Sequence, residues 1–193
     1  ARLAGAGRAA ATDLSRTAQH RIGHRADTEH QLAFDRIDAD THARDREALL
    51  AKGADPNARE EREQTAPMWA AAEGHAAVTH ALLEVGAEMH ARLKAGWTPM
   101  FFAVREGHID VVYTFLEAGA DVHARETSRE QTALMWAAGH SNDVPPADAV
   151  KTVDLLLERG AKPELKDNRG KTALIIAADR SHEAVLKVLA SVK

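Results

Sequence analysis

Residues 107–122 read GHIDVVYTFLEAGADV, and this stretch contains the pattern from which the architecture of the chain can be predicted. Its apolar residues recur at helical spacing, at Val111, Val112, Phe115 and Leu116. Gly107 can end a preceding helix in the left-handed conformation at no steric cost, and Gly119 can end the following one. The stretch therefore predicts a short helix that follows a tight turn.

The same pattern recurs along the chain. The dipeptide Gly-Ala is repeated with spacings of 33, 33 and 41 residues, starting at Gly53, Gly86, Gly119 and Gly160. A threonine recurs in step, with spacings of 33, 34 and 40 residues, at Thr65, Thr98, Thr132 and Thr172. Each threonine starts a similar string: TAPMWAA, TPMFFAV, TALMWAA and TALIIAA. Internal repeats of this length indicate a stacked-repeat architecture.

Each unit is predicted to form a helix, a turn, a second helix and a projecting finger. The threonine can cap the first helix, which contributes about 1 kcal/mol. The alanines that follow allow a second helix to approach closely. About a dozen polar, turn-rich residues then separate each Gly from the next Thr, and a segment such as DNRG at 167–170 favours a β-turn.

These residues resemble the ankyrin repeat, which has a period of about 33 residues and the signature Thr-Pro-Leu-His-x-Ala. The resemblance is strong over residues 53–193 and weaker over residues 32–59, where the first helix is poorly marked. It implies an all-α solenoid of about four to five stacked helix–turn–helix units with β-turn fingers. The repeat domain is expected over residues 32–193, in units of about 32–59, 60–92, 93–125, 126–166 and 167–193.

The units depart from the family signature at two positions. The signature histidine is replaced in every full unit, by Met68, Phe101, Met135 and Ile175. Packing is therefore expected to replace the hydrogen bond that this histidine makes in the family. In the unit 60–92, Pro67 stands where a core leucine is expected, and a lost leucine costs about 2–5 kcal/mol if nothing refills its site. We predict a slightly loose unit there.

The unit 126–166 contains a seven-residue insertion between its two helices. The interval from Thr132 to Gly160 is 28 residues, whereas the corresponding interval in the two preceding units is 21. The extra residues lie within 139–148, where Pro145-Pro146 and polar flanks predict a surface loop. Loop-closure entropy changes by only about 0.6 kcal/mol per doubling of length. Deletion of residues 141–147 is therefore expected to shift the melting temperature by only a few degrees.

Composition excludes several classes of function. The 193 residues carry 25 Lys and Arg against 29 Asp and Glu, so the net charge of -4 provides no basic field for nucleic acid or an anionic membrane. No apolar run approaches the roughly 20 residues of a transmembrane helix. The chain has no Cys, which fits a reducing or an oxidising compartment equally well. We expect a soluble protein; the cytoplasm is favoured, and a periplasmic or exported location stays open.

No constellation of residues predicts a metal site, a cofactor or catalysis. His20 and His24 would share a helix face near His30, but a solvated polar helix explains them better than a metal site does. The Gly-His turn of the repeat explains His75 and His108. The chain lacks a nucleophile elbow, a phosphate-binding glycine loop and a zinc-protease helix motif. We therefore expect no enzyme activity, no cofactor and no metal.

The three tryptophans receive different interpretations. Trp69 and Trp136 precede the alanine pairs of their first helices, where an aromatic residue is expected to pack between repeats. Trp97 lies between Gly96 and Thr98, in a finger position that resembles the partner-facing slot of the family. Trp97 is therefore expected to be exposed and to contribute to binding.

The resemblance implies that a partner protein binds in the concave groove formed by finger tips and first helices. Carried over by position, the finger residues are Glu61, Arg62, Gln64, Lys94, Trp97, Thr127, Arg129, Gln131, Asn168, Arg169 and Lys171. The first helices contribute Glu73, Arg105, Glu106, Asp179 and Arg180. The leading hypothesis is a non-enzymatic protein-interaction module. The alternative is a regulatory or targeting domain cut from a larger enzyme or a secreted effector.

The two ends of the chain are expected to differ. For residues 1–31, two alternatives stay open: a helix from about Thr12 that packs on the first unit, or partial disorder. Charged residues between 35 and 46 give the first unit a polar skin, as a terminal cap requires. The last helix is apolar on more than one side, around Val185, Leu189 and Val192. We expect a monomer with weak self-association through this C-terminal end.

Overall fold

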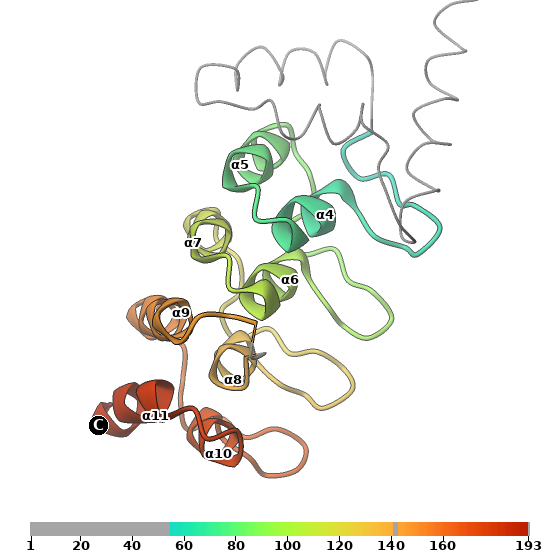
Figure 1. Cartoon of the computed structure of the whole chain (residues 1–193). Helices are drawn as coiled ribbons and strands as arrows, with labels where there is room; N and C mark the ends of the chain where they lie inside the picture. Colours follow the sequence, from blue (N-terminus) through green and yellow to red (C-terminus); the bar gives the residue numbers. More distant parts are fainter. Residues whose placement is uncertain (1–54, 141–142, 193) are drawn as a thin grey trace, which may run out of the picture.

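The computed structural model describes residues 55–140 and 143–192, and in this part the chain is a stack of helix pairs (Figure 1). Each predicted unit from residue 60 onward contains one pair. The pairs are α4 (Ala66–Ala72) with α5 (Ala76–Glu84), α6 (Pro99–Glu106) with α7 (Ile109–Glu117), α8 (Ala133–Ala138) with α9 (Pro146–Glu158), and α10 (Ala173–Asp179) with α11 (Glu183–Ser191). The described residues form no strand, only an isolated bridge between Arg125 and Thr132. The predicted all-α solenoid is confirmed.

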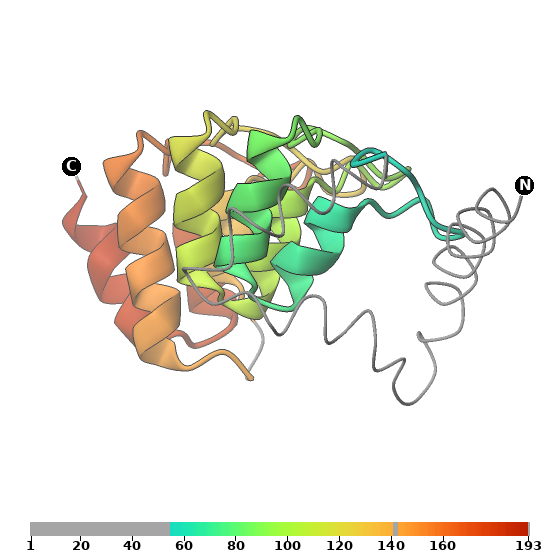
Figure 2. The ribbon, with the colours of Figure 1, turned by 90° about the horizontal axis from the view of Figure 1, so that it is seen from above.

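The helices form two layers, and the fingers project from one side of the stack (Figures 1 and 2). The first helices α4, α6, α8 and α10 pack on one another in sequence, and so do the second helices α5, α7, α9 and α11. Most of the buried apolar side chains form one core that runs through the stack, in which Met100, Phe115 and Leu134 are fully buried. A smaller separate cluster in the unit of α4 and α5 contains Ala70, Val78, Leu82 and Ala87. The first helices and the fingers therefore belong to one continuous stack.

The threonine caps are confirmed in two units only. The Oγ atoms of Thr132 and Thr172 accept hydrogen bonds from the amides three residues later, whereas Thr65 and Thr98 make no such bond. The two uncapped helices are those with a proline in their first turn. There the Met68 and Phe101 amides donate to the threonine backbone carbonyls, at 3.0 Å. A tight backbone turn thus replaces the side-chain cap.

The residues that replace the signature histidine pack as predicted in three units. Met68, Phe101 and Met135 are buried, but Ile175 is 41% exposed, because no further described unit covers α10. Leu174 and Val192 are exposed on the same terminal unit. Of the residues from which the apolar C-terminal surface was predicted, Val192 is exposed, but Val185 and Leu189 are buried in the core. Weak self-association stays a prediction, as does the looseness of the unit that contains Pro67.

Histidines at the turns between first and second helices connect neighbouring units. The Nε2–H of His108 donates to the carbonyl of Ala72, at 3.0 Å, and the Nδ1–H of His182 donates to that of Ala138, at 2.9 Å. Each carbonyl lies at or beside the C-terminus of a first helix, where backbone acceptors lack partners within the helix. These histidines therefore have a structural role, which for His108 agrees with the sequence interpretation; His182 follows Ser181 rather than a glycine.

The insertion differs from its prediction. Relative to α6 and α7, α8 is two residues shorter and α9 is four residues longer, so part of the inserted sequence is helical. Pro145 occupies the N-cap position of α9, and Pro146 is the first residue of this helix, a position where the missing N–H has no cost. Val144 is only 4% exposed and belongs to the core. The prediction of a surface loop is therefore wrong for Val144, which is buried, and for residues 146–148, which are helical. Residues 141–142 lie outside the described part.

Other predictions concern residues that are not described. They are the alternatives for residues 1–31, including His20, His24 and His30, and the polar cap of the unit 32–59.

Candidate functional site

Buried carboxylates shape the finger turns. Glu126 is 1% exposed, and its carboxylate accepts hydrogen bonds from the backbone amides of Ser128, Arg129 and Gln131, at 2.6, 2.7 and 3.2 Å, and from the Ser128 hydroxyl. Burial raises the pKa of Glu126, but these hydrogen bonds outweigh burial and leave the pKa below its ordinary value. These hydrogen bonds therefore fix the conformation of the turn that carries Arg129.

Asp167 has the same role in the last finger. Its Oδ1 accepts from the amides of Arg169 and Lys171, both at 2.9 Å, and its Oδ2 is 2.7 Å from the Arg169 guanidinium. Gln131 of the preceding finger also donates to Oδ2, at 3.2 Å. Burial raises the pKa of Asp167, but the Arg169 side chain and the amides lower it to about 2.

Asp167 should make the stability of the fold depend on pH at low pH. A carboxyl group whose pKa is lowered by folding stabilises the fold above its unfolded pKa of 3.8, and this contribution is lost as the pH falls toward about 2. At pH 7 we expect the Asp167→Asn variant to be less stable than the wild type by up to about 2 kcal/mol. At pH 2 the difference should largely disappear. Urea unfolding between pH 7 and pH 2 measures it, and a difference independent of pH would contradict the assignment.

Neighbouring fingers are tied together by hydrogen bonds. Thr127 donates to the carbonyls of Ala95 and Lys94, through its amide at 2.9 Å and its hydroxyl at 3.1 Å. The Asn168 amide donates to Arg129 O at 3.0 Å, and its side chain to Ser128 O at 3.1 Å. The side chains of Thr127 and Asn168, both predicted to contact a partner, are therefore engaged in holding the fingers in register.

Three arginines that the sequence interpretation did not assign form a ladder along the fingers. One guanidinium nitrogen of Arg59 donates to Arg92 O, that of Arg92 to Arg125 O, and that of Arg125 to Lys166 O, at 3.3, 3.1 and 2.9 Å. The spacing of 33 residues between these arginines was the signal that could have identified them. Each unit thus fixes the position of the next finger.

An aromatic cluster joins the fingers to the first helices in the middle of the stack. The Trp97 ring centroid lies 5.3 Å from that of Phe102 and 4.7 Å from that of Trp136, with edge-on geometry in both pairs. The Arg105 guanidinium lies over Trp97, at 5.2 Å from the ring centroid, and forms an ion pair with Glu106. Trp97 is only half-buried but packs against the core, so the expectation of a freely exposed Trp97 is wrong. Ring contacts across two units account for the difference.

Next to this cluster, the last two units form a pocket of about 240 Å³. The finger residues that line it are Arg129, Gln131, Arg169 and Lys171, and the first-helix residues are Met135, Trp136, Gly139, Ile176, Asp179 and Arg180. Six of the residues carried over from the family thus surround one hollow. Gln131 is 5% exposed, so it contributes to the wall mainly as a structural residue rather than as the expected contact.

The remaining predicted contact residues lie outside this pocket. Glu61, Arg62, Glu73, Lys94 and Glu106 are exposed, and Gln64 is half-buried. In the finger of the unit 60–92, the carboxylate of Glu60 accepts hydrogen bonds from the amides of Arg62 and Gln64, at 2.8 and 3.1 Å. The finger of the unit 93–125 has Leu93 where the neighbouring fingers have Glu60 and Glu126. Backbone hydrogen bonds alone close its turn. The turn carboxylates of Glu60, Glu126 and Asp167 were not predicted from the sequence.

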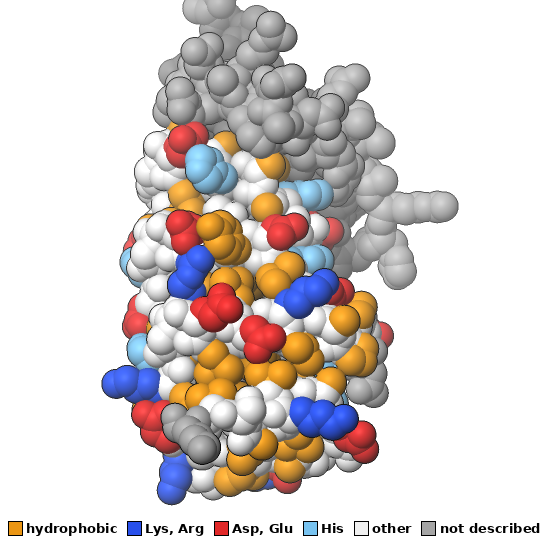
Figure 3. Space-filling view, turned by 90° about the vertical axis from the view of Figure 1, so that its left-hand side faces the viewer, with side chains coloured by type: hydrophobic (Ala, Val, Ile, Leu, Met, Phe, Trp, Pro, Cys, Tyr) orange, Lys and Arg blue, Asp and Glu red, His pale blue; other side chains and the backbone are white. Residues whose placement is uncertain are grey.

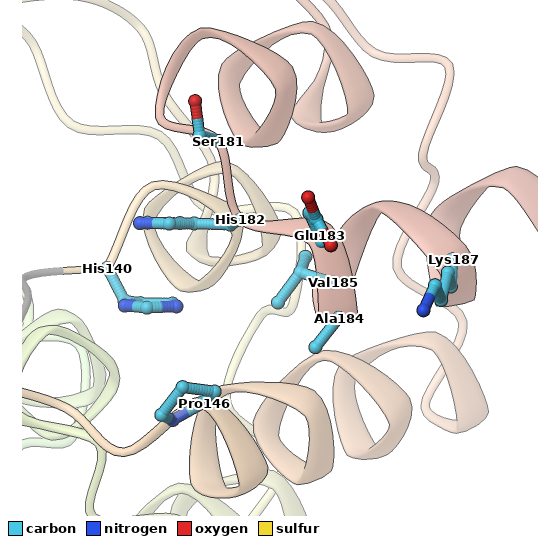
Figure 4. Close-up of a pocket in the computed structure, with 8 residues that line it drawn as sticks. All are labelled: His140, Pro146, Ser181, His182, Glu183, Ala184, Val185 and Lys187. Atoms are coloured by element: carbon cyan, nitrogen blue, oxygen red, sulfur yellow. The ribbon is translucent and has the colours of Figure 1, made fainter.

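A second hollow, of about 430 Å³, lies at the turns between α8 and α9 and between α10 and α11 (Figure 4). His140 and His182 are stacked there, with ring centroids 3.8 Å apart and planes within 4° of each other. His182 is already bonded to Ala138 O. No group of three or more potential metal ligands occurs among the described residues. This hollow is thus mainly a junction between units.

The stacked helix pairs define a helical-repeat solenoid. The family model described as "Ankyrin repeats (3 copies)" matches residues 43–126 and 125–193, so the chain belongs to the ankyrin-repeat family. Ankyrin repeats generally mediate protein–protein interactions and are typically non-enzymatic. No curated protein matches the chain. Among the described helices, none combines the length and the apolar character that crossing a membrane requires.

Proposed function

We propose that this chain is a non-enzymatic protein-interaction module whose partner binds in the groove between the fingers and the first helices. The observation that carries the proposal is the convergence of Arg129, Arg169, Lys171, Asp179 and Arg180 around one pocket beside the Trp97–Trp136 pair. Aromatic and arginine side chains on a preorganised surface are the groups that dominate protein interfaces. No comparison supports the alternative of a domain cut from a larger enzyme or effector.

The proposal is tested by removing groove side chains. Replacing Trp97, Arg105 and Arg129 together by Ala should weaken capture of the partner about fivefold or more, as truncation of interface anchors does. Because Trp97 also packs on the core, its truncation is expected to cost about 1–3 kcal/mol of stability. The Arg105→Ala/Arg129→Ala variant avoids this cost and is the decisive one. Affinity capture with quantitative mass spectrometry, after a circular-dichroism check of folding, measures the effect.

The outer face of the second helices provides a matched control (Figure 3). There Arg159 lies over the Tyr113 ring, at 4.9 Å, as Arg105 lies over Trp97. The Lys151→Ala/Arg159→Ala variant removes the same amount of positive charge from this face. A partner that is retained by the groove variant and lost by the outer-face variant would contradict the proposal.

A further inference from the structure

The pocket at the last two units concentrates positive charge on a chain that is acidic overall. Four cationic side chains line it, against the one carboxylate of Asp179, whereas the whole chain has a net charge of -4. On the face formed by the second helices, acidic and basic side chains are interspersed (Figure 3). The pocket therefore differs from that face in the sign and the concentration of its charge.

The four cations are not equivalent. Arg169 is bound by the buried Asp167, and Lys171 by Asp179, so both charges are largely compensated within the fold. The guanidinium groups of Arg129 and Arg180 are exposed, and within residues 55–140 and 143–192 neither has an ion-pair partner. Both keep their planar donor forks available for a carboxylate, which such forks bind in a bidentate manner.

Part of the wall of the same pocket is apolar. The side chains of Met135, Trp136 and Ile176 line it from α8 and α10. Trp136 is also part of the aromatic cluster with Trp97, so the apolar surface continues toward the middle of the groove. An occupant that satisfies both kinds of wall carries a carboxylate and, next to it, an apolar side chain.

A peptide fits these requirements better than a nucleic acid does. Only Arg129 and Arg180 keep an uncompensated charge in the pocket, too few to neutralise a run of phosphates, and the net charge of -4 opposes long-range attraction of a polyanion. A short peptide segment instead places one or two carboxylates locally. Charge complementarity thus favours an acidic segment of a protein.

We infer that this pocket binds a short acidic segment of the partner, with a carboxylate held between Arg129 and Arg180 and an adjoining apolar side chain against Trp136. This inference rests on the proposed function and adds the chemistry of the partner to it. Hydrogen bonds to Glu126 and Asp167 fix the turns that carry Arg129 and Arg169, so the fingers lose little conformational entropy when the segment binds.

The probe for the test is a phage-displayed library of random linear peptides, selected on the full chain. We expect the enriched peptides to carry an excess of Asp and Glu over the input library. Selection on the Arg129→Glu/Arg180→Glu variant should lose this excess and favour Lys and Arg instead. A variant that merely lost its structure would enrich neither charge, so the reversal separates recognition from folding.

The leading acidic peptide is then labelled and titrated by fluorescence polarisation. The Arg129→Glu/Arg180→Glu variant should bind it at least about tenfold more weakly than the wild type. The Lys162→Glu/Lys187→Glu variant makes the same change in net charge at exposed residues outside the pocket. Its affinity for the peptide should stay within about twofold of the wild type, because exposed charges at a distance are largely screened at physiological ionic strength.

Selection of peptides without acidic excess, the absence of any enrichment, or equal losses in the two charge-reversal variants would overturn the inference. These peptide results are separate from the test of the proposed function, which measures capture of the partner by the Arg105→Ala/Arg129→Ala variant. If that capture depends on the groove while the peptides show no acidic preference, the proposed function stands and only the acidic segment is rejected.

Discussion

Deletion of residues 141–147 should lower the free energy of unfolding by about 2–4 kcal/mol. One part of the loss is the Val144 side chain, which is buried in the core between units. A second part follows from the register: the deletion restores the 21-residue interval from Thr132 to Gly160, but it places Asp148 nine residues after Thr132. Gly74 and Gly107 occupy this place in their units, each with φ of +78°. The deletion therefore forces Asp148 into a left-handed conformation that is strained for a residue other than glycine.

A companion variant separates the two contributions. Adding Asp148→Gly to the deletion removes the left-handed strain and should recover about 1 kcal/mol, while the loss of Val144 persists. Urea unfolding followed by circular dichroism measures both values. A melting temperature within a few degrees of the wild type for the deletion alone would support the sequence-based expectation of an expendable loop.

The Gly107→Ala substitution should lower the free energy of unfolding by about 2–4 kcal/mol, from backbone strain and steric overlap together. Gly107 has φ of +78°, and a Cβ atom at this position would lie 2.6 Å from Val144 Cγ1. The units 93–125 and 126–166 meet at this contact, so neither can move away without opening the core between them.

Gly119 provides the matched control. It also has a positive φ, of +92°, but a Cβ atom there would meet nothing within 4 Å. Gly119→Ala should therefore cost only the backbone strain, about 1 kcal/mol. In the Val144→Ala background the overlap at Gly107 disappears, because the Val144 Cβ lies at 3.5 Å, and Gly107→Ala should then resemble Gly119→Ala. Equal costs of Gly107→Ala in both backgrounds would disprove the contact.

The candidate site could be predicted only in part. Arg129, Arg169, Lys171, Asp179 and Arg180, selected by their position in the repeat, line one pocket, and their role in binding stays a proposal. It could not distinguish arginines that are free from those already paired, since the partners Asp167 and Glu106 act through side-chain geometry rather than spacing. For the same reason Trp97 was expected to be exposed, although Phe102 and Trp136 hold it in a packed cluster.

The helix pairs, their order and their spacing followed from the sequence alone, because the Thr and Gly periodicities act locally through turns and helix ends. Only the tertiary structure decided the course of the insertion. Pro145-Pro146 is compatible with a loop and equally with the start of a helix, and the packing of Val144 against Gly107 of the preceding unit selects the second. Contacts between units depend on shape and on available volume, which a single repeat does not encode.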